Sequence, residues 1–207
     1  MPMPDDAIQS FQHVWIDKKS PRTLLLLHGT GADEHDLIPL GGNLDPAANI
    51  LSPRGRVDEH GMTRFFRRIS DFVFDEDSIR FEVGALSEFL RAAAAAYGFG
   101  LEGTVAVGYS NGANTAASLL LLHPESIGSI LMIRGSLPLE PSPMPDLSGK
   151  KVLLLNGEID RLISLENAHK FVELARGAGA SVEQHILPAG HEITRQDYVL
   201  MREWLGN

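Results

Sequence analysis

Apolar residues along the chain alternate between short continuous runs and longer stretches with helical spacing. Residues 23–27 form a run that ends at His28-Gly29 and predicts a strand buried on both faces. Residues 78–97 carry apolar side chains on one helical face and are followed by Gly98, a common C-terminal cap. The same reasoning predicts further strands at 11–16, 49–51, 104–107, 129–133, 152–155 and 182–187, and further helices at 111–122, 164–176 and 193–205.

This alternation of strands and helices is typical of an α/β fold. Strands separated by helices of this length indicate a mostly parallel central sheet of about seven strands with helices on both faces, and residues 11–16 alternate like an edge strand. The chain shows no internal repeat and no linker, so we expect one domain over residues 1–207. The stretch 137–145 contains four prolines and is predicted to be a surface loop. Ligands bind such sheets at the carboxyl ends of the strands, where candidate functional residues are therefore sought.

The net charge of the chain limits the classes of molecule that it can bind. The 207 residues include 27 acidic and 18 basic side chains, and the net charge of -9 would repel nucleic acid or an anionic membrane surface. Cysteine is absent, which excludes disulfides, thiolate metal sites and a cysteine nucleophile. Residues 1–6 lack the features of a signal peptide and the apolar runs are too short to span a bilayer. We therefore expect a cytoplasmic protein without membrane insertion.

The segment Gly108-Tyr109-Ser110-Asn111-Gly112 lies between a predicted strand and a predicted helix, the setting of a G-x-S-x-G nucleophile elbow. Such a sharp turn strains the backbone at Ser110, and side chains two residues away would collide with neighbouring elements, which explains Gly108 and Gly112. The helix N-terminus beneath Ser110 favours developing negative charge. The alternative is a glycine-rich turn with a solvated serine. The flanking elements favour Ser110 as a nucleophile.

Two other strand ends supply the partners that a serine nucleophile needs. Asp160 and His191 follow the last two predicted strands. A turn or capping role is the alternative for Asp160, and Glu158 is its nearest competitor. The order Ser110, Asp160, His191 along the chain is the order of α/β-hydrolase triads. We therefore predict His191 as the base and Asp160 as the carboxylate that orients it.

A glycine-rich turn begins at His28, directly after the first buried strand. Backbone amides in a fixed turn suit the negative charge of an acyl-transfer oxyanion, and we predict the amides of Thr30 and Asn111 as the donors. The turn lacks the lysine and the spacing of phosphate-binding loops, which disfavours that alternative. His28 is predicted to be a hydrogen-bonded structural group. The histidines lack metal-ligand spacing with supporting acids, so no metal site is expected.

Together these motifs resemble the carboxylesterase/phospholipase family of α/β-hydrolases, whose relatives include dienelactone hydrolases and acyl-protein thioesterases. The resemblance covers nearly the whole chain and includes residues 27–37, the elbow, Asp160 and Gly190-His191. Residues 52–55 and 61–68 are similar to its hydroquinone-associated branch. Dienelactone hydrolases proper use a cysteine nucleophile, so the serine here puts their own reaction in doubt.

The resemblance implies a minimal hydrolase without a separate cap domain. It assigns the nucleophile, acid and base to Ser110, Asp160 and His191, and the amide donors to Thr30 and Asn111. The expected reaction is hydrolysis of a small or medium ester through an acyl-enzyme on Ser110, without a cofactor; a homodimer is compatible with the family. A thioesterase or lysophospholipase using the same triad is the alternative. A non-catalytic ligand-binding protein of this fold is less favoured, because all three triad residues are present.

Residues 54–74 concentrate arginine and phenylalanine in a strongly acidic chain: Arg54, Arg56, Arg64, Arg67, Arg68, Phe65, Phe66, Phe72 and Phe74. Placed over the site, this segment would accept an acyl group with a carboxylate or an aromatic ring. The candidate substrate-binding residues are Gly31, Arg64, Phe65, Phe66 and Arg67. In the alternative interpretation the arginines pair with neighbouring carboxylates and the phenylalanines belong to the core.

Overall fold

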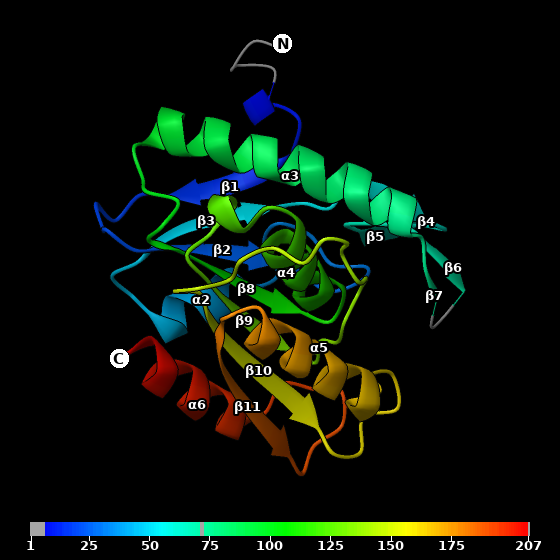
Figure 1. The fold of residues 1–207 in the computed structure, drawn as a ribbon. Helices are drawn as coiled ribbons and strands as arrows, with labels where there is room; N and C mark the ends of the chain where they lie inside the picture. The colour runs from blue at the N-terminus through cyan, green and yellow to red at the C-terminus, as the bar shows by residue number, and fades with distance from the viewer. Residues whose placement is uncertain (1–6, 71–72, 207) are drawn as a thin grey trace.

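The computed structural model describes residues 7–70 and 73–206. Residues 1–6, on which the signal-peptide prediction rests, together with 71–72 and 207, lie outside the described residues. In the described part of the chain the central sheet has seven strands, in the order β1-β3-β2-β8-β9-β10-β11 (Figure 1). Their bounds are β1 His13–Ile16, β2 Thr23–Leu27, β3 Asn49–Pro53, β8 Thr104–Tyr109, β9 Ser129–Ile133, β10 Lys151–Gly157 and β11 Ser181–Leu187. Edge strand β1 is antiparallel to β3 and the other pairs are parallel, which confirms the predicted α/β class.

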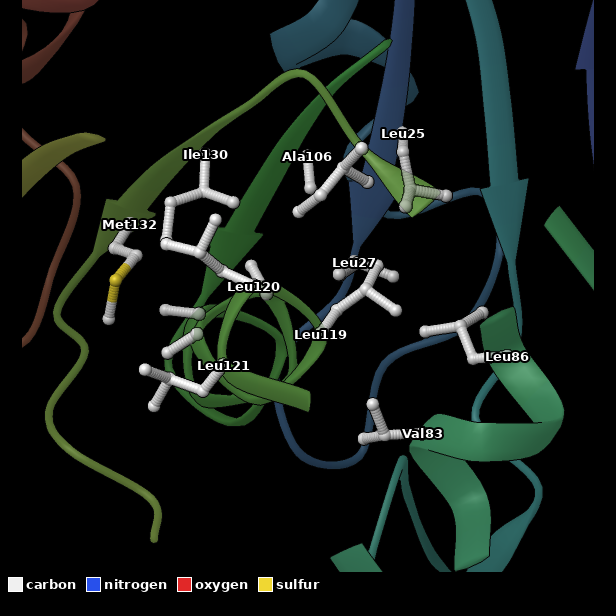
Figure 2. Packing of buried hydrophobic residues seen from close by; sticks show 14 of the residues in the cluster. Leu25, Leu27, Val83, Leu86, Ala106, Leu119, Leu120, Leu121, Ile130 and Met132 are labelled. Carbon is white, nitrogen blue, oxygen red and sulfur yellow. The ribbon is translucent and has the colours of Figure 1, made fainter. Parts of the chain in front are cut away.

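Helices cover both faces of the sheet because successive strand residues point to opposite sides (Figure 1). In β2, Leu25 and Leu27 join the core beneath α3 (Glu76–Tyr97), α4 (Asn111–Leu122) and α5 (Leu165–Gly177). Leu24 and Leu26 join the opposite core, with α2 (Ile38–Leu44) and α6 (Arg195–Leu205). Figure 2 shows the leucines of α4 facing both the sheet and α3. The sheet is therefore buried on both faces, as its apolar runs predict.

Local signals explain where two of the helices begin and end. The side chain of Asp75 accepts a hydrogen bond from the Ser78 amide at the start of α3, and Gly98 ends that helix with a φ of 76°. Helix α6 begins two residues later than predicted, because Thr194 and Asp197 form a capping box there.

Two hairpins beyond the carboxyl end of β3 were not predicted from the hydrophobic pattern. They consist of β4 (Val57–Glu59) with β5 (Met62–Arg64), and β6 (Arg68–Ser70) with β7 (Val73–Phe74). Their strands are only two or three residues long, too short to show an alternating pattern. Helix α2 and the short 3₁₀ helix η1 (Pro124–Ser126) were also missed. The hairpins matter for function because they lie at the end of the sheet to which the strands point (Figure 1).

The proline-rich stretch 137–145 is a loop, but the prediction that it lies on the surface is wrong for its first half. Leu137 and Leu139 are buried and belong to the core that includes α4 and α5. The prolines keep the segment out of helix and sheet while its leucines still gain from burial. In the described part of the chain, no helix combines the length and the apolar character needed to cross a membrane.

Candidate active site

The turn between β8 and α4 has the geometry of a nucleophile elbow. Ser110, at the tip, has a φ of 53°, a positive value that is uncommon for residues other than glycine. A Cβ atom at Gly108 would lie 2.3 Å from the carbonyl oxygen of Gly112, and one at Gly112 would lie 1.9 Å from that of Leu27. Both positions therefore require glycine. The turn places the Ser110 hydroxyl at the N-terminus of α4.

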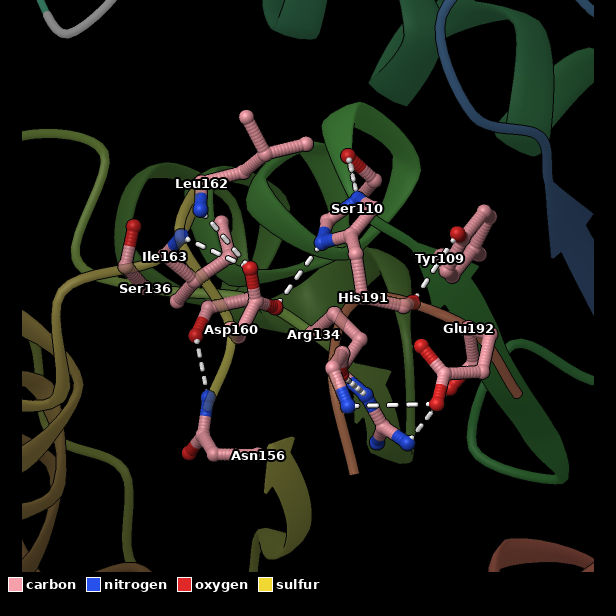
Figure 3. A network of polar contacts seen from close by, with 12 residues as sticks. Tyr109, Ser110, Arg134, Ser136, Asn156, Asp160, Leu162, Ile163, His191 and Glu192 are labelled. Carbon is pink, nitrogen blue, oxygen red and sulfur yellow. Dashed lines mark hydrogen bonds and ion pairs between the residues drawn. The ribbon is translucent and has the colours of Figure 1, made fainter. Parts of the chain in front are cut away.

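Three side chains from three separate loops form one hydrogen-bonded series at this edge of the sheet (Figure 3). Ser110 Oγ lies 3.0 Å from His191 Nε2, and His191 Nδ1 lies 2.8 Å from Asp160 Oδ2. An ionised carboxylate only accepts hydrogen bonds, so Nδ1 carries the proton and Nε2 is left to accept from the serine hydroxyl. The sequence prediction brought these three residues together, and the structure places them in contact.

Asp160 is held firmly in this series. Its side chain is only 1% exposed, and Oδ1 accepts hydrogen bonds from the amides of Leu162 (2.8 Å) and Ile163 (3.2 Å). Both carboxylate oxygens are therefore occupied, one by the loop backbone and the other by His191. Glu158, the competitor for this role, is exposed.

The loop that carries His191 is fixed by a residue that sequence reasoning missed. Arg134, directly after β9, donates from Nε to the carbonyl of Gly190 (2.9 Å) and from Nη2 to that of Glu192 (2.7 Å). The hydroxyl of Tyr109 donates to the carbonyl between them, that of His191, at 3.0 Å. Three consecutive carbonyls of the loop are thus hydrogen-bonded. These bonds fix the loop backbone and thereby hold the imidazole of His191 in position. We call these contacts the His191 clamp.

The guanidinium of the His191 clamp forms a fully buried ion pair with Asp197. Both side chains are 0% exposed, and Nη1 and Nη2 of Arg134 each lie 2.8 Å from one carboxylate oxygen. Burial by itself raises the pKa of Asp197, but hydrogen bonds from Arg134 and Thr194 outweigh it and hold the pKa below its ordinary value of 3.8. Because Asp197 also caps α6, the clamp joins the His191 loop to that helix.

The predicted oxyanion donors, Thr30 and Asn111, follow β2 and β8 and line one pocket together with Ser110. In residues 7–70 and 73–206, neither the Thr30 amide nor the Asn111 amide donates to another protein group. The turn before Thr30 is fixed by His28, whose Nδ1 lies 2.7 Å from the Gly29 carbonyl and whose Nε2 accepts from the Gly55 amide at 3.0 Å. Burial lowers the pKa of His28, which favours the neutral ring with its proton on Nδ1. His28 is thus a structural group, as the sequence predicts.

A pocket of about 440 Å³ opens beside Ser110 and His191. Of the candidate substrate-binding residues, Arg64 lines it, but Gly31, Phe65, Phe66 and Arg67 do not. The two phenylalanines are buried in the core, and Arg67 points outward to pair with Asp75. Gly31 instead donates its amide to the Thr63 carbonyl and supports β5. Arg68 and Phe74, which the sequence analysis placed in the arginine- and phenylalanine-rich segment, also line the pocket. Sequence reasoning missed the other lining residues, namely Met62, Tyr109, Asn114, Leu162 and Ile163.

The alternative interpretation of residues 54–74 holds for Arg67 and Arg68, which pair with Asp75 and Glu59. Arg54 and Arg56 pair with carboxylates outside the segment, those of Glu34 and Glu82. Phe72 lies outside the described residues. Within the described ranges, no group of three or more His, Asp or Glu side chains is arranged to hold a metal ion.

Comparison with known proteins agrees with this geometry. The family model described as Phospholipase/Carboxylesterase matches residues 14–206. MhqD of Bacillus subtilis strain 168, named as a hydrolase, is 38% identical over 193 residues, which is 93% of this chain and 96% of MhqD. The Bacillus cereus carboxylesterase structure is 38% identical with a TM-score of 0.92, over 95% of this chain and 94% of that one. The structure of YahD with malic acid is 27% identical with a TM-score of 0.88, over 95% and 98% of the two chains. The chain thus belongs to the phospholipase/carboxylesterase family and is an α/β-hydrolase of the carboxylesterase type.

Proposed function

We propose that the protein hydrolyses small carboxylic esters through an acyl-enzyme on Ser110. The observation that carries this proposal is the hydrogen-bonded series from Ser110 through His191 to Asp160, placed at the edge of a pocket. A nucleophile, a base in contact with it and a carboxylate that orients the base are what acyl transfer requires.

In the first half of the reaction, Ser110 Oγ attacks the ester carbonyl carbon and its proton passes to His191 Nε2. Asp160 stabilises the imidazolium that forms. When the tetrahedral intermediate collapses, the bond to the alcohol oxygen breaks and the alcohol leaves with the proton from Nε2. In the second half, water repeats the attack on the acyl-enzyme, and the acid leaves while Ser110 regains its proton.

The amides of Thr30 and Asn111 are suited to stabilise the negative charge on the carbonyl oxygen. Neither has a protein acceptor among the described residues, and Asn111 begins the helix whose N-terminus points at the site. Donors of this kind each contribute roughly 10²- to 10³-fold to rate when they are fixed before the reaction begins.

The pocket favours small esters over long-chain lipids. A volume of about 440 Å³ lies near the lower end of the usual range for small-molecule sites. YahD, a relative of this chain, has been solved with malic acid, a small carboxylic acid. We therefore expect short 4-nitrophenyl esters to be cleaved with a higher kcat/KM than acyl-CoA or lysophospholipid, and the reverse order would favour the thioesterase or lysophospholipase alternative.

The decisive experiment combines covalent labelling with mutation of the nucleophile. A fluorophosphonate probe should label the wild-type protein, and Ser110→Ala should abolish labelling and lower turnover of 4-nitrophenyl acetate by on the order of 10⁴- to 10⁶-fold. Ser148→Ala, at an exposed serine remote from the pocket lining, is the matched control and should change neither reading. Wild-type turnover in Ser110→Ala would refute the proposal.

A further inference from the structure

One wall of the pocket carries two guanidinium groups. Arg64 and Arg68, from β5 and β6, both line it. Arg64 is only 4% exposed and is held in place by two hydrogen bonds, from Nη1 to Thr30 Oγ1 (2.6 Å) and from Nε to the Phe66 carbonyl (3.2 Å). A nearly buried cation thus lies beside the turn that carries Thr30.

Both arginines of this wall approach the same carboxylate oxygen. The carboxylate that approaches Arg64 is Glu59, with 3.9 Å between Oε2 and Nε. The same oxygen already accepts a hydrogen bond from Arg68 at 2.7 Å. Among the described residues that line the pocket, none is acidic. Burial lowers the pKa of Arg64, Glu59 acts in the opposite direction, and Arg68 adds to the lowering. A bound anion would offset the cost of burying this cation.

The opposite wall has a different character. Leu162 and Ile163 belong to the loop after β10, whereas the arginines belong to the hairpins after β3. In the sheet, β3 and β10 lie on opposite sides of β8, the strand that carries Ser110. Figure 3 shows Leu162 and Ile163 beside the triad on the Asp160 side. An ester bond at Ser110 therefore has on one side a wall that carries both arginines together with Met62 and Phe74, and on the other side an apolar wall.

From this arrangement we propose that the enzyme is selective for esters that bear a carboxylate on one part and a small apolar group on the other. The carboxylate binds Arg64 and Arg68, and the apolar group contacts Leu162 and Ile163. Because Arg64 also contacts Thr30, the carboxylate lies close to the reacting carbonyl, which limits the spacer between them to a few atoms. This selectivity rests on the proposed function of Ser110 as the nucleophile.

The test uses pairs of esters that differ only in charge. Monobutyl succinate carries the carboxylate on its acyl part, and butyl levulinate is its neutral counterpart, with a methyl ketone in place of the carboxylate. Butanoyl glycolate carries the carboxylate on the alcohol part, and butanoyl glycolamide is its neutral counterpart. The wild-type enzyme should prefer the charged member of at least one pair, and the pair identifies which part of the ester faces the arginines. Equal kcat/KM within both pairs would overturn the proposal.

Three arginine variants then test which side chains produce the preference for charged esters. Arg64→Gln and Arg68→Gln should each lower the charged-to-neutral ratio of kcat/KM by roughly 10- to 100-fold, the effect of one charged hydrogen bond. Arg67→Gln is the matched control, because that neighbouring side chain is outside the pocket lining, and its ratio should stay at the wild-type value. Equal losses on charged and neutral esters in both pocket variants would show that these arginines only support the fold.

Ligand binding separates this inference from the proposed function. Succinate should bind the Ser110→Ala variant, which cannot turn over, and binding should weaken at least tenfold when Arg68→Gln is added. If the fluorophosphonate fails to label Ser110 yet succinate binds in an Arg68-dependent way, the proposed reaction fails and the carboxylate site stands. If labelling succeeds but succinate binding does not depend on the arginines, the carboxylate site is refuted and the esterase proposal stands.

Discussion

The two regions on either side of Ser110 use arginine in opposite ways. In the His191 clamp, Arg134 is fully buried, pairs with Asp197 and donates to loop carbonyls. In the hairpins, the outer arginines form pairs at the surface, such as Arg67 with Asp75, where the side chains are 64% and 24% exposed. The ion pair of the clamp is thus shielded from solvent, whereas the hairpin ion pairs are screened by water.

This difference shows where each region obtains its fixed geometry. The hairpins are anchored by backbone amides: that of Phe65 donates to Asn111 Oδ1 at 2.8 Å, and that of Gly55 donates to His28 Nε2 at 3.0 Å. A Cβ atom at Gly55 would lie 2.3 Å from the Arg64 carbonyl oxygen, so the two backbones are in direct contact there. We therefore expect the hairpins to hold their place without their outer ion pairs, and the His191 loop to depend on Arg134. We infer that the clamp serves the chemistry and the hairpins serve selectivity.

The largest effect that tests this contrast should come from Arg134→Gln. The variant leaves Asp197 buried without its cation and removes the donors of two loop carbonyls. Breaking a buried pair typically costs about 3–5 kcal/mol of unfolding free energy. Arg67→Gln, the same change in an exposed hairpin pair, should cost no more than about 1 kcal/mol. Urea unfolding of both variants measures these two losses of unfolding free energy. Equal losses would show that the clamp and the exposed hairpin pair do not differ.

A smaller and more selective change is Tyr109→Phe. It removes the hydrogen bond to the His191 carbonyl but keeps the ring that lies against the imidazole, with centroids 5.3 Å apart. We expect a loss of about 1 kcal/mol in unfolding free energy. We also expect kcat to fall roughly tenfold, more than KM changes, because the base is less well oriented.

Tyr97→Phe is the matched control for this prediction. The Tyr97 hydroxyl lies 2.7 Å from Nε2 of His13, a residue of edge strand β1. Neither residue lines the pocket. Its loss should lower stability by a similar amount while kcat stays at the wild-type value. If both tyrosine variants lose kcat equally, Tyr109 does not act as a positioning residue.

The sequence was sufficient to predict the parts of the molecule that depend on local patterns. Strand β2 and helix α3 have long apolar signals and clear ends, and the elbow glycines are required by contacts within one turn. Ser110, Asp160 and His191 follow three strands, and parallel strands bring their carboxyl ends to one edge. Because of this topology, the sequence alone predicts that residues up to 81 positions apart lie together.

The remaining features depend on contacts that no local pattern encodes. Arg67 and Arg68 are neighbours in sequence, yet only Arg68 lines the pocket, because Arg67 lies just before β6 and its side chain pairs with Asp75 instead. Phe65 and Phe66 have the composition of a binding wall but are buried in the core. The position of Arg134 could have been recognised from the sequence, because it directly follows a buried strand at the edge of the sheet where functional residues gather.

The smallest expected effect is a difference in how the two regions respond to acid. In the hairpin region, burial lowers the pKa of His28 below its ordinary value of 6.5, although Asp33 and Asp36 act in the opposite direction. The unfolded chain therefore takes up this proton first, and the contribution of neutral His28 to stability is lost as the pH falls below about 6.5. The clamp responds later: the lowered pKa of Asp197 keeps its contribution intact down to about pH 3.8, and it is lost below that value.

Thermal unfolding between pH 8 and pH 5 tests the first of these two windows. The Tm of the wild-type protein should fall as the pH drops through this range. His28→Gln keeps an acceptor for the Gly55 amide but cannot take up a proton, so its Tm should depend less on pH. His185→Gln is the control, since that partly buried histidine pairs with the exposed Glu183, and it should keep the wild-type slope. Parallel curves for wild type and His28→Gln would mean that the hairpin anchor is indifferent to protonation, and the proposed difference between the two regions would then rest on the buried ion pair alone.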